Sequence, residues 1–241
     1  MPVVTLPLLF VLMSYNLNQG NPDPDSSMDA IEAGDADIVV LQETNAAWQT
    51  RLEERFAKLY PHRAFHPRPF GGLAVLSKHP IKANELLARP KGAFSPAQRF
   101  VADTPLGEIQ ILNVHLRPNV DRGNWLLGWK TTPPIRRHEI ETYWKKLSRS
   151  LPTIVAGDFN EAPDGSAVGF LADKGLSRVA TKGPTTWHHA VRVGKKRISA
   201  LSMDIDHVVV DRAFKATGGH VVDAGASDHR PVVVTLARAT R

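Results

Sequence analysis

Short apolar segments, separated by turns, recur along the whole chain. Several are apolar at consecutive positions, which is typical of strands covered on both faces rather than strands with one solvated face. The pattern therefore predicts a layered protein in which each sheet is covered by helices or by another sheet. The segments are residues 9–17, 37–43, 73–78, 109–116, 153–160, 205–210 and 231–236.

Two other segments predict amphipathic helices, because their apolar residues recur at intervals of three and four and so share one helix face. The first segment begins at Trp48, and the second covers residues 136–149. We expect both apolar stripes to pack in the core, including their aromatic side chains. The stripes are Leu52, Phe56 and Leu59 in the first segment, and Ile140, Tyr143, Trp144 and Leu147 in the second.

Segments rich in proline and glycine predict surface loops, at residues 21–27, 66–72, 89–96 and 131–134. The apolar start, residues 1–13, has no Lys or Arg before it and no small-residue cleavage pattern after it. It is also too short to span a bilayer. We interpret it as a buried strand and expect no membrane span. The sequence leaves the compartment open, with the cytoplasm slightly favoured over export.

The composition is that of an ordinary globular protein, with 42% hydrophobic and 22% charged residues in a chain of 241. We expect one domain over residues 1–241, acting as a monomer. Cysteine is absent, which excludes disulfides, thiolate metal sites and cysteine nucleophiles. Lys and Arg outnumber Asp and Glu by 30 to 24, a net charge of +6. This excess favours an anionic partner such as nucleic acid, although it also serves solubility.

Polar residues stand at one end of almost every predicted strand. For a single strand, an Asp or Asn at this place usually caps the following turn. Its repetition on strand after strand indicates instead that these side chains meet at one end of the sheets. They are Asn16, Asn18, Glu43, His115, Asp158, Asn160, Asp206, Asp228 and His229.

Carboxylates, carboxamides and imidazoles form this set, without a thiol and without a G-x-S-x-G serine motif. Such a set suits a hard divalent cation with oxygen ligands. Several carboxylates in one pocket resist ionising together unless a cation neutralises them. We therefore expect one or two Mg2+ or Mn2+ ions, whose coordination a phosphate ester would complete.

Six short segments carry a resemblance to a known family. YNLN, LQE, NVHL, GDFN, DIDHVVV and SDHRPV, in this order over almost the full length, resemble the endonuclease/exonuclease/phosphatase superfamily. The resemblance implies an α/β (α+β) fold, a four-layer sandwich of two mixed β-sheets packed face to face with helices outside. It also implies hydrolysis of phosphoester bonds with one or two divalent ions.

The resemblance implies a metal site as well. Glu43 would be the principal metal ligand, with Asn18 and Asp228 beside it. Abasic-site endonucleases of the superfamily often have Asp where this chain has Asn18, so this site carries one negative charge fewer. Asn16 and Asn160 would hold phosphate oxygens.

Four residues would take part in the chemistry. Asp158 would orient or deprotonate the attacking water, and His115 would contact the phosphoryl oxygens or assist the leaving group. Asp206 and His229 would form a carboxylate–imidazole pair that neutralises charge or acts as a base. Asp204 is the rival partner for His229, because it lies two residues before Asp206 on the same strand face.

Two segments beside these residues predict contacts with substrate. Residues 191–199 predict a hairpin whose basic tip would either be solvated or hold a phosphate backbone. Residues 117–134 interleave aromatic and basic side chains, which suits base stacking or a hydrophobic lid. Trp187 would form the floor of the pocket. The predicted substrate contacts are Arg117, Trp125, Trp129, Trp187, Lys195, Lys196 and Arg197.

Two further pairs have ordinary explanations. His188 and His189 are adjacent on a strand and face opposite ways, so a zinc site there is not expected. Arg136 and Arg137 open a helix, where cations oppose the helix dipole. This placement indicates either a phosphate contact or ion pairs with Glu139 or Glu141.

The sequence as a whole predicts a metal-dependent phosphodiesterase whose favoured substrate is DNA, acting as an endonuclease or an exonuclease. A lipid or inositol phosphate hydrolase of the same superfamily is the first alternative. A catalytically silent nucleic-acid-binding protein is the second. The presence of Glu43, Asp158 and His229 together argues against the silent protein.

Overall fold

The computed structural model describes residues 8–193 and 196–239. Its helices are α1 (Pro24–Ala33), α2 (Ala46–Phe56), α3 (Trp125–Thr131), α4 (Pro133–Trp144) and α5 (Ser166–Asp173). Its strands are β1 (Phe10–Asn16), β2 (Ile38–Gln42), β3 (His62–His66), β4 (Leu73–Ser77), β5 (Ile81–Leu87), β6 (Ala97–Thr104), β7 (Gly107–His115), β8 (Thr153–Asp158), β9 (Ser177–Arg178), β10 (Trp187–Val193), β11 (Lys196–Met203), β12 (Asp206–Val210), β13 (Phe214–Val221) and β14 (Val232–Arg238).

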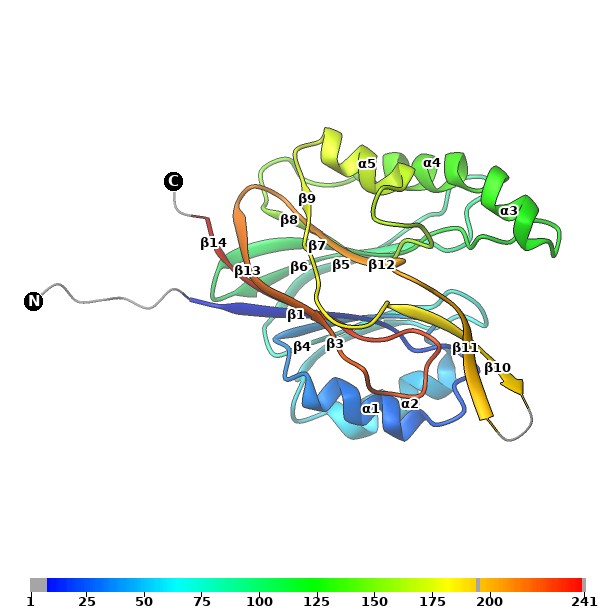
Figure 1. The fold of residues 1–241 in the computed structure, drawn as a ribbon. Helices are drawn as coiled ribbons and strands as arrows, with labels where there is room; N and C mark the ends of the chain where they lie inside the picture. The colour runs from blue at the N-terminus through cyan, green and yellow to red at the C-terminus, as the bar shows by residue number, and fades with distance from the viewer. Residues whose placement is uncertain (1–7, 194–195, 240–241) are drawn as a thin grey trace, which may run out of the picture.

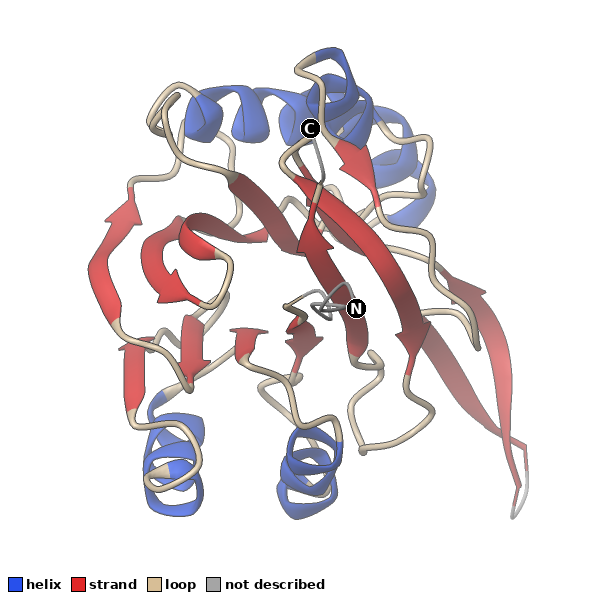
Figure 2. Ribbon diagram, turned by 90° about the vertical axis from the view of Figure 1, so that its left-hand side faces the viewer, coloured by secondary structure: helices blue, strands red, loops and turns tan. Residues whose placement is uncertain are grey.

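Two six-stranded sheets lie face to face, and helices cover the outer side of each (Figures 1 and 2). The first sheet has the order β13-β14-β1-β2-β4-β3, and the second has the order β5-β6-β7-β8-β12-β9. Helices α1 and α2 lie on the first sheet, and α4 and α5 lie on the second. Both sheets are mixed, since β1 pairs parallel to β2 and β7 parallel to β8. The predicted four-layer α/β sandwich is confirmed.

The strands are apolar at consecutive positions because each of their faces lines a different core. In β1, Leu12 belongs to the core between the two sheets, whereas Met13 packs in the core under α1 and α2. In β7, Ile111 faces the core between the sheets and Leu112 faces α4 and α5. Alternate residues of one strand point to opposite sides of the sheet, so three stacked apolar layers result.

A cluster of buried amides crosses the core between the two sheets. Gln42 of β2 donates from Nε2 to Oδ1 of Asn113 in β7 at 2.8 Å. Asn113 donates in return to the carbonyls of Leu41 at 3.1 Å and Ala74 at 3.2 Å, which belong to the first sheet. A buried amide is costly unless it is hydrogen-bonded, so these bonds favour one alignment of the sheets. Residue 43 follows Gln42 directly, and residue 115 lies two positions after Asn113.

The two predicted helices are present as α2 and α4. Tyr143 and Trp144 are buried in the core between α4, α5 and the second sheet, as expected. Leu59 lies beyond the end of α2 but still packs against the core beneath that helix. Strand β1 starts at Phe10, and both Leu8 and Leu9 are exposed. The predicted buried strand therefore starts later than expected, and residues 1–7 lie outside the described part of the chain.

Two segments in which no helix was expected contain helices. Helix α1 begins inside residues 21–27, where Asp23 accepts a hydrogen bond from the backbone N–H of Ser26 and Pro24 occupies the first turn. Helix α3 lies within residues 117–134, where Asn124 caps it by accepting from the N–H of Leu127 at 3.0 Å. In residues 21–27, and in residues 131–134 where α4 begins at Pro133, the prolines that suggested a loop instead begin a helix.

Candidate active site

The strand ends that carry polar residues meet at the right-hand end of the molecule in Figure 1. Parallel pairing puts the carboxyl ends of β1 and β2 at the same edge of the first sheet, and those of β7 and β8 at the same edge of the second. Strand β12 runs antiparallel to β8, so Asp206 at its start lies opposite Asp158 at the end of β8. Residues from distant parts of the chain are thereby brought into one cluster.

Asn16 lies in the middle of the cluster. Its Nδ2 donates to Oδ2 of Asp158 at 3.0 Å and to Oε1 of Glu43 at 3.2 Å. His115 lies on the other side of the same carboxylates, with Nε2 at 3.4 Å from Oδ2 of Asp158 and 3.9 Å from Oε1 of Glu43. Asn16, His115 and Asp158 are buried, whereas the Glu43 side chain is 24% exposed. Glu43 is therefore the member of this group that solvent or an ion can reach.

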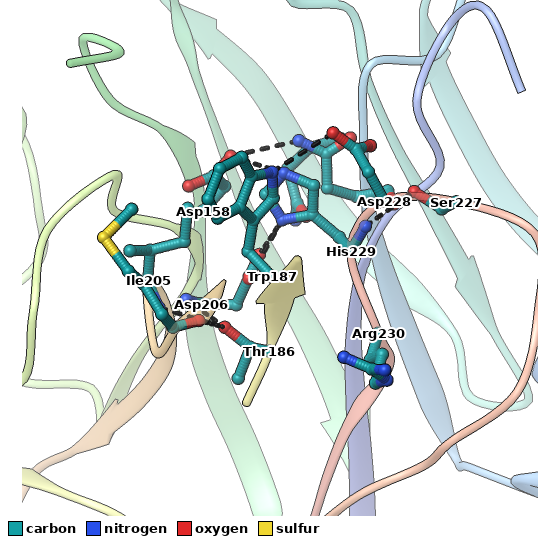
Figure 3. Close-up of polar contacts among 12 residues, drawn as sticks. Asp158, Thr186, Trp187, Ile205, Asp206, Ser227, Asp228, His229 and Arg230 are labelled. Carbon is teal, nitrogen blue, oxygen red and sulfur yellow. Dashed lines mark hydrogen bonds and ion pairs between the residues drawn. The ribbon is translucent and has the colours of Figure 1, made fainter. Parts of the chain in front are cut away.

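His229 lies between two aspartates (Figure 3). Its Nδ1 lies 2.9 Å from Oδ2 of Asp206, and its Nε2 lies 3.7 Å from Oδ2 of Asp158. Burial by itself lowers the pKa of His229, but the charges of Asp206 and Asp158 outweigh burial and raise the pKa to about 10. The ring is therefore an imidazolium at neutral pH. Of the two uses predicted for this pair, the geometry and charge favour neutralisation over action as a base.

Asp158 is the most buried carboxylate of the cluster. Burial raises its pKa to about 6, and the charge of Asp206 acts in the same direction. Electrostatic interaction with His229 and His115 opposes this rise and lowers the pKa, as does a hydrogen bond from the N–H of Asn160 to Oδ1 at 2.8 Å. Oδ2 receives the bond from Asn16 described above, so both oxygens of Asp158 are held in place.

A second group of polar side chains lies beside the first. Asn18 donates from Nδ2 to Oδ1 of Asp228 at 2.7 Å, and Trp187 donates from Nε1 to Oδ2 of Asp228 at 3.1 Å (Figure 3). The backbone links the two groups, because the N–H of Asn18 donates to Oδ1 of Asn16. Trp187 is buried, with 8% of its surface exposed, and lies beside Asp228; its place at the floor of a substrate pocket stays a prediction.

Three residues of the cluster have a left-handed backbone. The φ angles are 54° for Asn18, 58° for Glu43 and 52° for Asn160. Residues other than glycine adopt this region at an energetic cost, and Asn does so most readily. The turn after each strand is therefore shaped to aim these side chains, and for Glu43 the left-handed conformation carries a larger cost than for the two asparagines.

The donor set fits a divalent cation. Glu43, Asp158, Asp206 and Asp228 lie in one cluster, and one ligand atom each from Asp158, Asp206 and His229 lie within 4.8 Å of one another. However, His229 and Asp206 already bond to each other, so that trio has less free coordinating capacity than its spacing suggests. Each carboxylate oxygen of Glu43 in the first group and of Asp228 in the second accepts one hydrogen bond and keeps a further lone pair, so these two residues are the better fit for a resident ion.

Several residues that support the cluster were not predicted. Ser227 donates from Oγ to the carbonyl of Asn16 at 2.8 Å and accepts from the N–H of His229 at 3.1 Å. Thr186 accepts on Oγ1 from the N–H groups of Ile205 and Asp206 (Figure 3). Both residues stand directly beside a predicted one in sequence, namely Asp228 and Trp187. A hydroxyl residue next to a predicted site residue was the signal in the sequence that could have indicated these two supporting residues.

The predicted partner of His229 is correct in the structure, since Asp206 and not Asp204 contacts the ring. Asp204 instead accepts the N–H of Thr186 on Oδ1 at 3.1 Å. His188 and His189 belong to β10. His189 stacks on Trp187, with ring centroids 6.3 Å apart, and the backbone N–H of His188 donates to the carbonyl of Asp228.

Arg136 differs from both expectations for it. The side chain is buried and pairs with Glu161, with Nε 3.1 Å from Oε2, instead of binding Glu139 or Glu141. Its Nη1 also donates to the carbonyl of Arg117 and to Oδ1 of Asn119. Arg137 forms the expected pair with Glu141 at 2.8 Å.

Of the predicted substrate contacts, Trp125 and Trp187 lie beside the cluster. The Trp125 ring lies over Trp187, with centroids 5.7 Å apart, and Trp129 is 52% exposed on α3. The Arg117 backbone N–H donates to Glu139 at 2.8 Å, and its Nη2 donates to the carbonyl of Val120. Strands β10 and β11 form the predicted hairpin. Lys195 lies outside the described residues, and the side chains of Lys196 and Arg197 are likewise not described.

Comparisons with known proteins agree with this architecture. A bacterial endonuclease/exonuclease/phosphatase from Beutenbergia cavernae superposes with a TM-score of 0.72 and 21% identity, covering 96% of this chain and 72% of that one. Zebrafish (D. rerio) TDP2 complexed with a single-strand DNA product gives 0.72 and 12% identity, over 95% and 98%. The human Nocturnin catalytic domain with bound sulfate gives 0.71 and 16% identity, over 97% and 94%. No curated protein sequence matches the chain.

The fold and the site together define a class of protein, in which two mixed sheets form a sandwich with a cluster of carboxylates and imidazoles at one end. The sequence matches the Endonuclease/Exonuclease/phosphatase family over residues 13–229, so the chain belongs to that family. Its members are hydrolases of phosphoester bonds, and they typically use divalent metal ions. No helix in the described part of the chain is long and apolar enough to cross a membrane.

Proposed function

We propose that this protein is a divalent-metal-dependent phosphodiesterase that cleaves DNA, as an endonuclease or an exonuclease. One observation carries the proposal: Glu43, Asp158 and the Asp206-bonded His229 lie together around Asn16, although they come from four separate strands and loops. A carboxylate beside an imidazolium can hold a nucleophilic water on one side of a phosphorus atom and neutralise charge on the other.

The residues best suited to hold the ion are Glu43 and Asp228, supported by Asn18. Mg2+ and Mn2+ both accept such oxygen ligands. When bound there, the ion supplies Lewis acidity that polarises the phosphoester. Glu43 is the most accessible carboxylate of its group. A metal ligand has to be accessible, because the ion must reach it from solvent.

The remaining residues bind and position the reacting groups. Asp158, held through Oδ1 by the N–H of Asn160, would accept a proton from the attacking water. His229, protonated at neutral pH, would donate from Nε2 to a phosphoryl oxygen as charge builds there. His115 would add a hydrogen bond to the same oxygens, and Asn16, whose two amide hydrogens go to Glu43 and Asp158, would position those carboxylates. Asn160 would contribute the amide hydrogen that is not bonded to the carbonyl of Leu116.

Three features support DNA as the substrate. The chain has a net charge of +6, which favours a polyanion. Helix α3 presents Trp125 and Trp129 beside the cluster, and exposed aromatic rings stack with bases. The similar TDP2 structure holds a single-strand DNA product.

The test is a substrate panel with metal and chelator. Supercoiled plasmid, single-stranded DNA, an abasic duplex, RNA and an inositol phosphate would each be incubated with Mg2+, Mn2+ or EDTA. We expect DNA cleavage that requires metal and falls steeply with salt. Glu43→Gln should lower the rate about 100-fold or more, and Glu53→Gln on the exposed face of α2 serves as the control. Cleavage that persists in EDTA would contradict the proposal.

A second candidate is a lipid phosphate hydrolase, and one observation favours it. Leu126 of α3 is 82% exposed and Leu127 is 37% exposed, between two tryptophans. Aliphatic side chains gain little from nucleic acid but partition into lipid. Hydrolysis of a phospholipid in vesicles, with no cleavage of any nucleic acid, would favour this candidate. Slower migration of DNA on a gel in the presence of the protein, without cleavage with any divalent metal, would favour a catalytically silent binding protein.

A further inference from the structure

A cavity of about 390 Å³ lies next to the candidate active site. Its wall includes Glu161, which follows Asn160, and Ile205, which precedes Asp206. Asn119, also in the wall, donates from Nδ2 to the carbonyl of Asn160 at 2.8 Å. The volume lies within the range of cavities that hold small organic groups. A group attached to a phosphate bound at Asn160 and His229 is therefore within reach of this cavity.

The cavity has a flat aromatic wall that is open to solvent. Trp129 of α3 lines it and is 52% exposed, and Met203 and Pro133 add further apolar surface. Indole faces bind planar rings by stacking, and Met sulfur packs well against ring edges. A flat heterocycle would make these contacts, whereas a highly hydrated group would gain little from them.

The charges in the wall exclude a second phosphate. Arg136 is the wall's cation, but its charge is balanced by Glu161 at 3.1 Å, and Nη1 already donates to three oxygens. Asp204 adds a further negative charge to the wall. An anionic group would therefore meet net repulsion here, which disfavours inositol polyphosphates and nucleoside bisphosphates as occupants.

Asp204 supplies a hydrogen-bond acceptor at the edge of the cavity. Its Oδ1 accepts the N–H of Thr186, whereas Oδ2 has no hydrogen-bond partner among the residues that the structure describes. A free carboxylate oxygen facing a cavity selects groups that carry an N–H donor. A stacking face with an acceptor at its edge is the arrangement that recognises a nucleobase.

We propose that this cavity is a nucleobase subsite, formed by the Trp129 ring and the Asp204 carboxylate, that binds the base adjoining the scissile phosphate. The inference rests on the proposed function, because it assumes a phosphodiester bound at the neighbouring cluster. It extends that function by assigning the substrate class to nucleotides, in which a base with an N–H donor is read on one side of the phosphorus. Trp129 and Asp204 are specificity-determining residues here and take no part in bond cleavage.

The test compares p-nitrophenyl phosphodiesters with and without a base. 2′-Deoxyadenosine esters carrying the p-nitrophenyl phosphate at the 5′ or the 3′ oxygen, called adenosine esters below, would be compared with the corresponding baseless deoxyribose esters and with methyl p-nitrophenyl phosphate. We expect kcat/KM about tenfold or more higher for at least one adenosine ester than for its baseless counterpart. Trp129→Ala should remove this advantage, measured as the ratio of kcat/KM for the adenosine ester to kcat/KM for its baseless counterpart.

Two further variants separate base recognition from general damage to the site. Asp204→Asn keeps the acceptor for Thr186 but replaces the free carboxylate oxygen, so it should reduce the advantage of the adenosine ester by about tenfold. Leu126→Ala, on the same helix but outside the cavity, should leave the advantage unchanged. Equal rates for adenosine and baseless esters, or an equal loss on all substrates in Trp129→Ala, would overturn the subsite.

Direct binding makes the result independent of hydrolysis. Calorimetric titration with adenosine monophosphate in Mg2+ should show binding to the protein that is weakened about tenfold or more in Trp129→Ala. If no ester is hydrolysed but this binding and its loss are observed, the proposed function fails and the nucleobase subsite stands. If the esters are hydrolysed and adenosine monophosphate binds both proteins equally, the function stands and the subsite fails.

Discussion

Nδ1 of His229 lies 2.9 Å from Oδ2 of Asp206, and this contact fixes which nitrogen of the ring faces the candidate active site. Because Nδ1 is engaged by the aspartate, Nε2 is the atom directed towards Asp158, at 3.7 Å from Oδ2. The two aspartates together keep the ring protonated despite its burial. The orientation and the charge of His229 therefore both depend on Asp206.

Replacing Asp206 should change the alkaline limb of the pH–rate profile. In the native protein the pKa of His229 is raised to about 10, so activity that depends on the imidazolium should persist up to about that pH. In Asp206→Asn one of the two main charges that raise the pKa is gone, and the limb should move to a pH about 1 to 3 lower. Measurement of kcat/KM between pH 5 and pH 11 checks this, and an unmoved limb would show that another group sets it.

Asn18→Asp should make the thermal stability of the protein depend more strongly on bound metal. Asn18 donates to Asp228 at 2.7 Å, and the aspartate would replace this bond by repulsion between two carboxylates. Without metal the variant should unfold at a lower temperature than the native protein. A bound cation would neutralise the pair, so the rise in Tm on adding Mg2+ or Mn2+ should be larger in the variant. An equal or smaller rise would mean that residue 18 lies away from the ion.

Glu139→Gln should flatten the dependence of stability on pH. Burial raises the pKa of Glu139 from 4.5 to about 7, against the opposing hydrogen bonds from the N–H groups of Arg117 and Phe94. The folded state therefore binds a proton more tightly than the unfolded chain. Its contribution to stability is full below about pH 4.5 and is lost as the pH rises through about 7, a change of about 3 kcal/mol.

Urea denaturation at pH 5 and pH 8 measures this contribution. The loss of unfolding free energy between the two pH values should be smaller by about 3 kcal/mol in Glu139→Gln than in the native protein. Glu141→Gln is the matched control, because Glu141 lies on the same helix in a partly exposed pair with Arg137. A change of the same size in both variants would assign the pH dependence to another group.

Arg136→Met should destabilise the fold by about 3 to 5 kcal/mol. It leaves the buried Glu161 carboxylate unpaired and removes the bonds from Nη1 to the loop after His115. Glu161 also accepts the N–H groups of Ala167 and Val168 at the start of α5, so it cannot simply turn away. Combining the change with Glu161→Gln should recover part of the loss, because both charges are then gone.

A double-mutant cycle measured by urea denaturation gives the coupling between Arg136 and Glu161. Arg137→Met is the control, because its pair with Glu141 is partly exposed and should be worth less than about 1 kcal/mol. Strictly additive losses at positions 136 and 161 would contradict the structural pairing.

The strands and the residues at their ends could be predicted because their signals are local. An apolar run that stops at Asp158 or His115 shows both where a strand ends and which side chain stands there. The sequence also suggested the correct partner for His229.

The parts that could not be predicted depend on contacts between distant residues. Arg136 and Glu161 are on different elements, and nothing near either residue indicates that they pair. Helix α5 was missed because its first turn is capped by Glu161 and not by a residue at the cap position itself. Likewise the cavity beside Asn160 exists only where α3, α4 and the end of β11 come together.

The amide cluster in the middle of the sandwich has a consequence for how the two halves of the site stay aligned. Apolar contacts between sheets are non-directional, so they restrain small sliding movements less strictly than hydrogen bonds do. The bond between Gln42 and Asn113 removes that freedom one residue from Glu43 and two residues from His115. Substituting leucine for both amides could therefore yield a protein that melts no earlier than the original and yet holds its carboxylate and its imidazole at a variable separation.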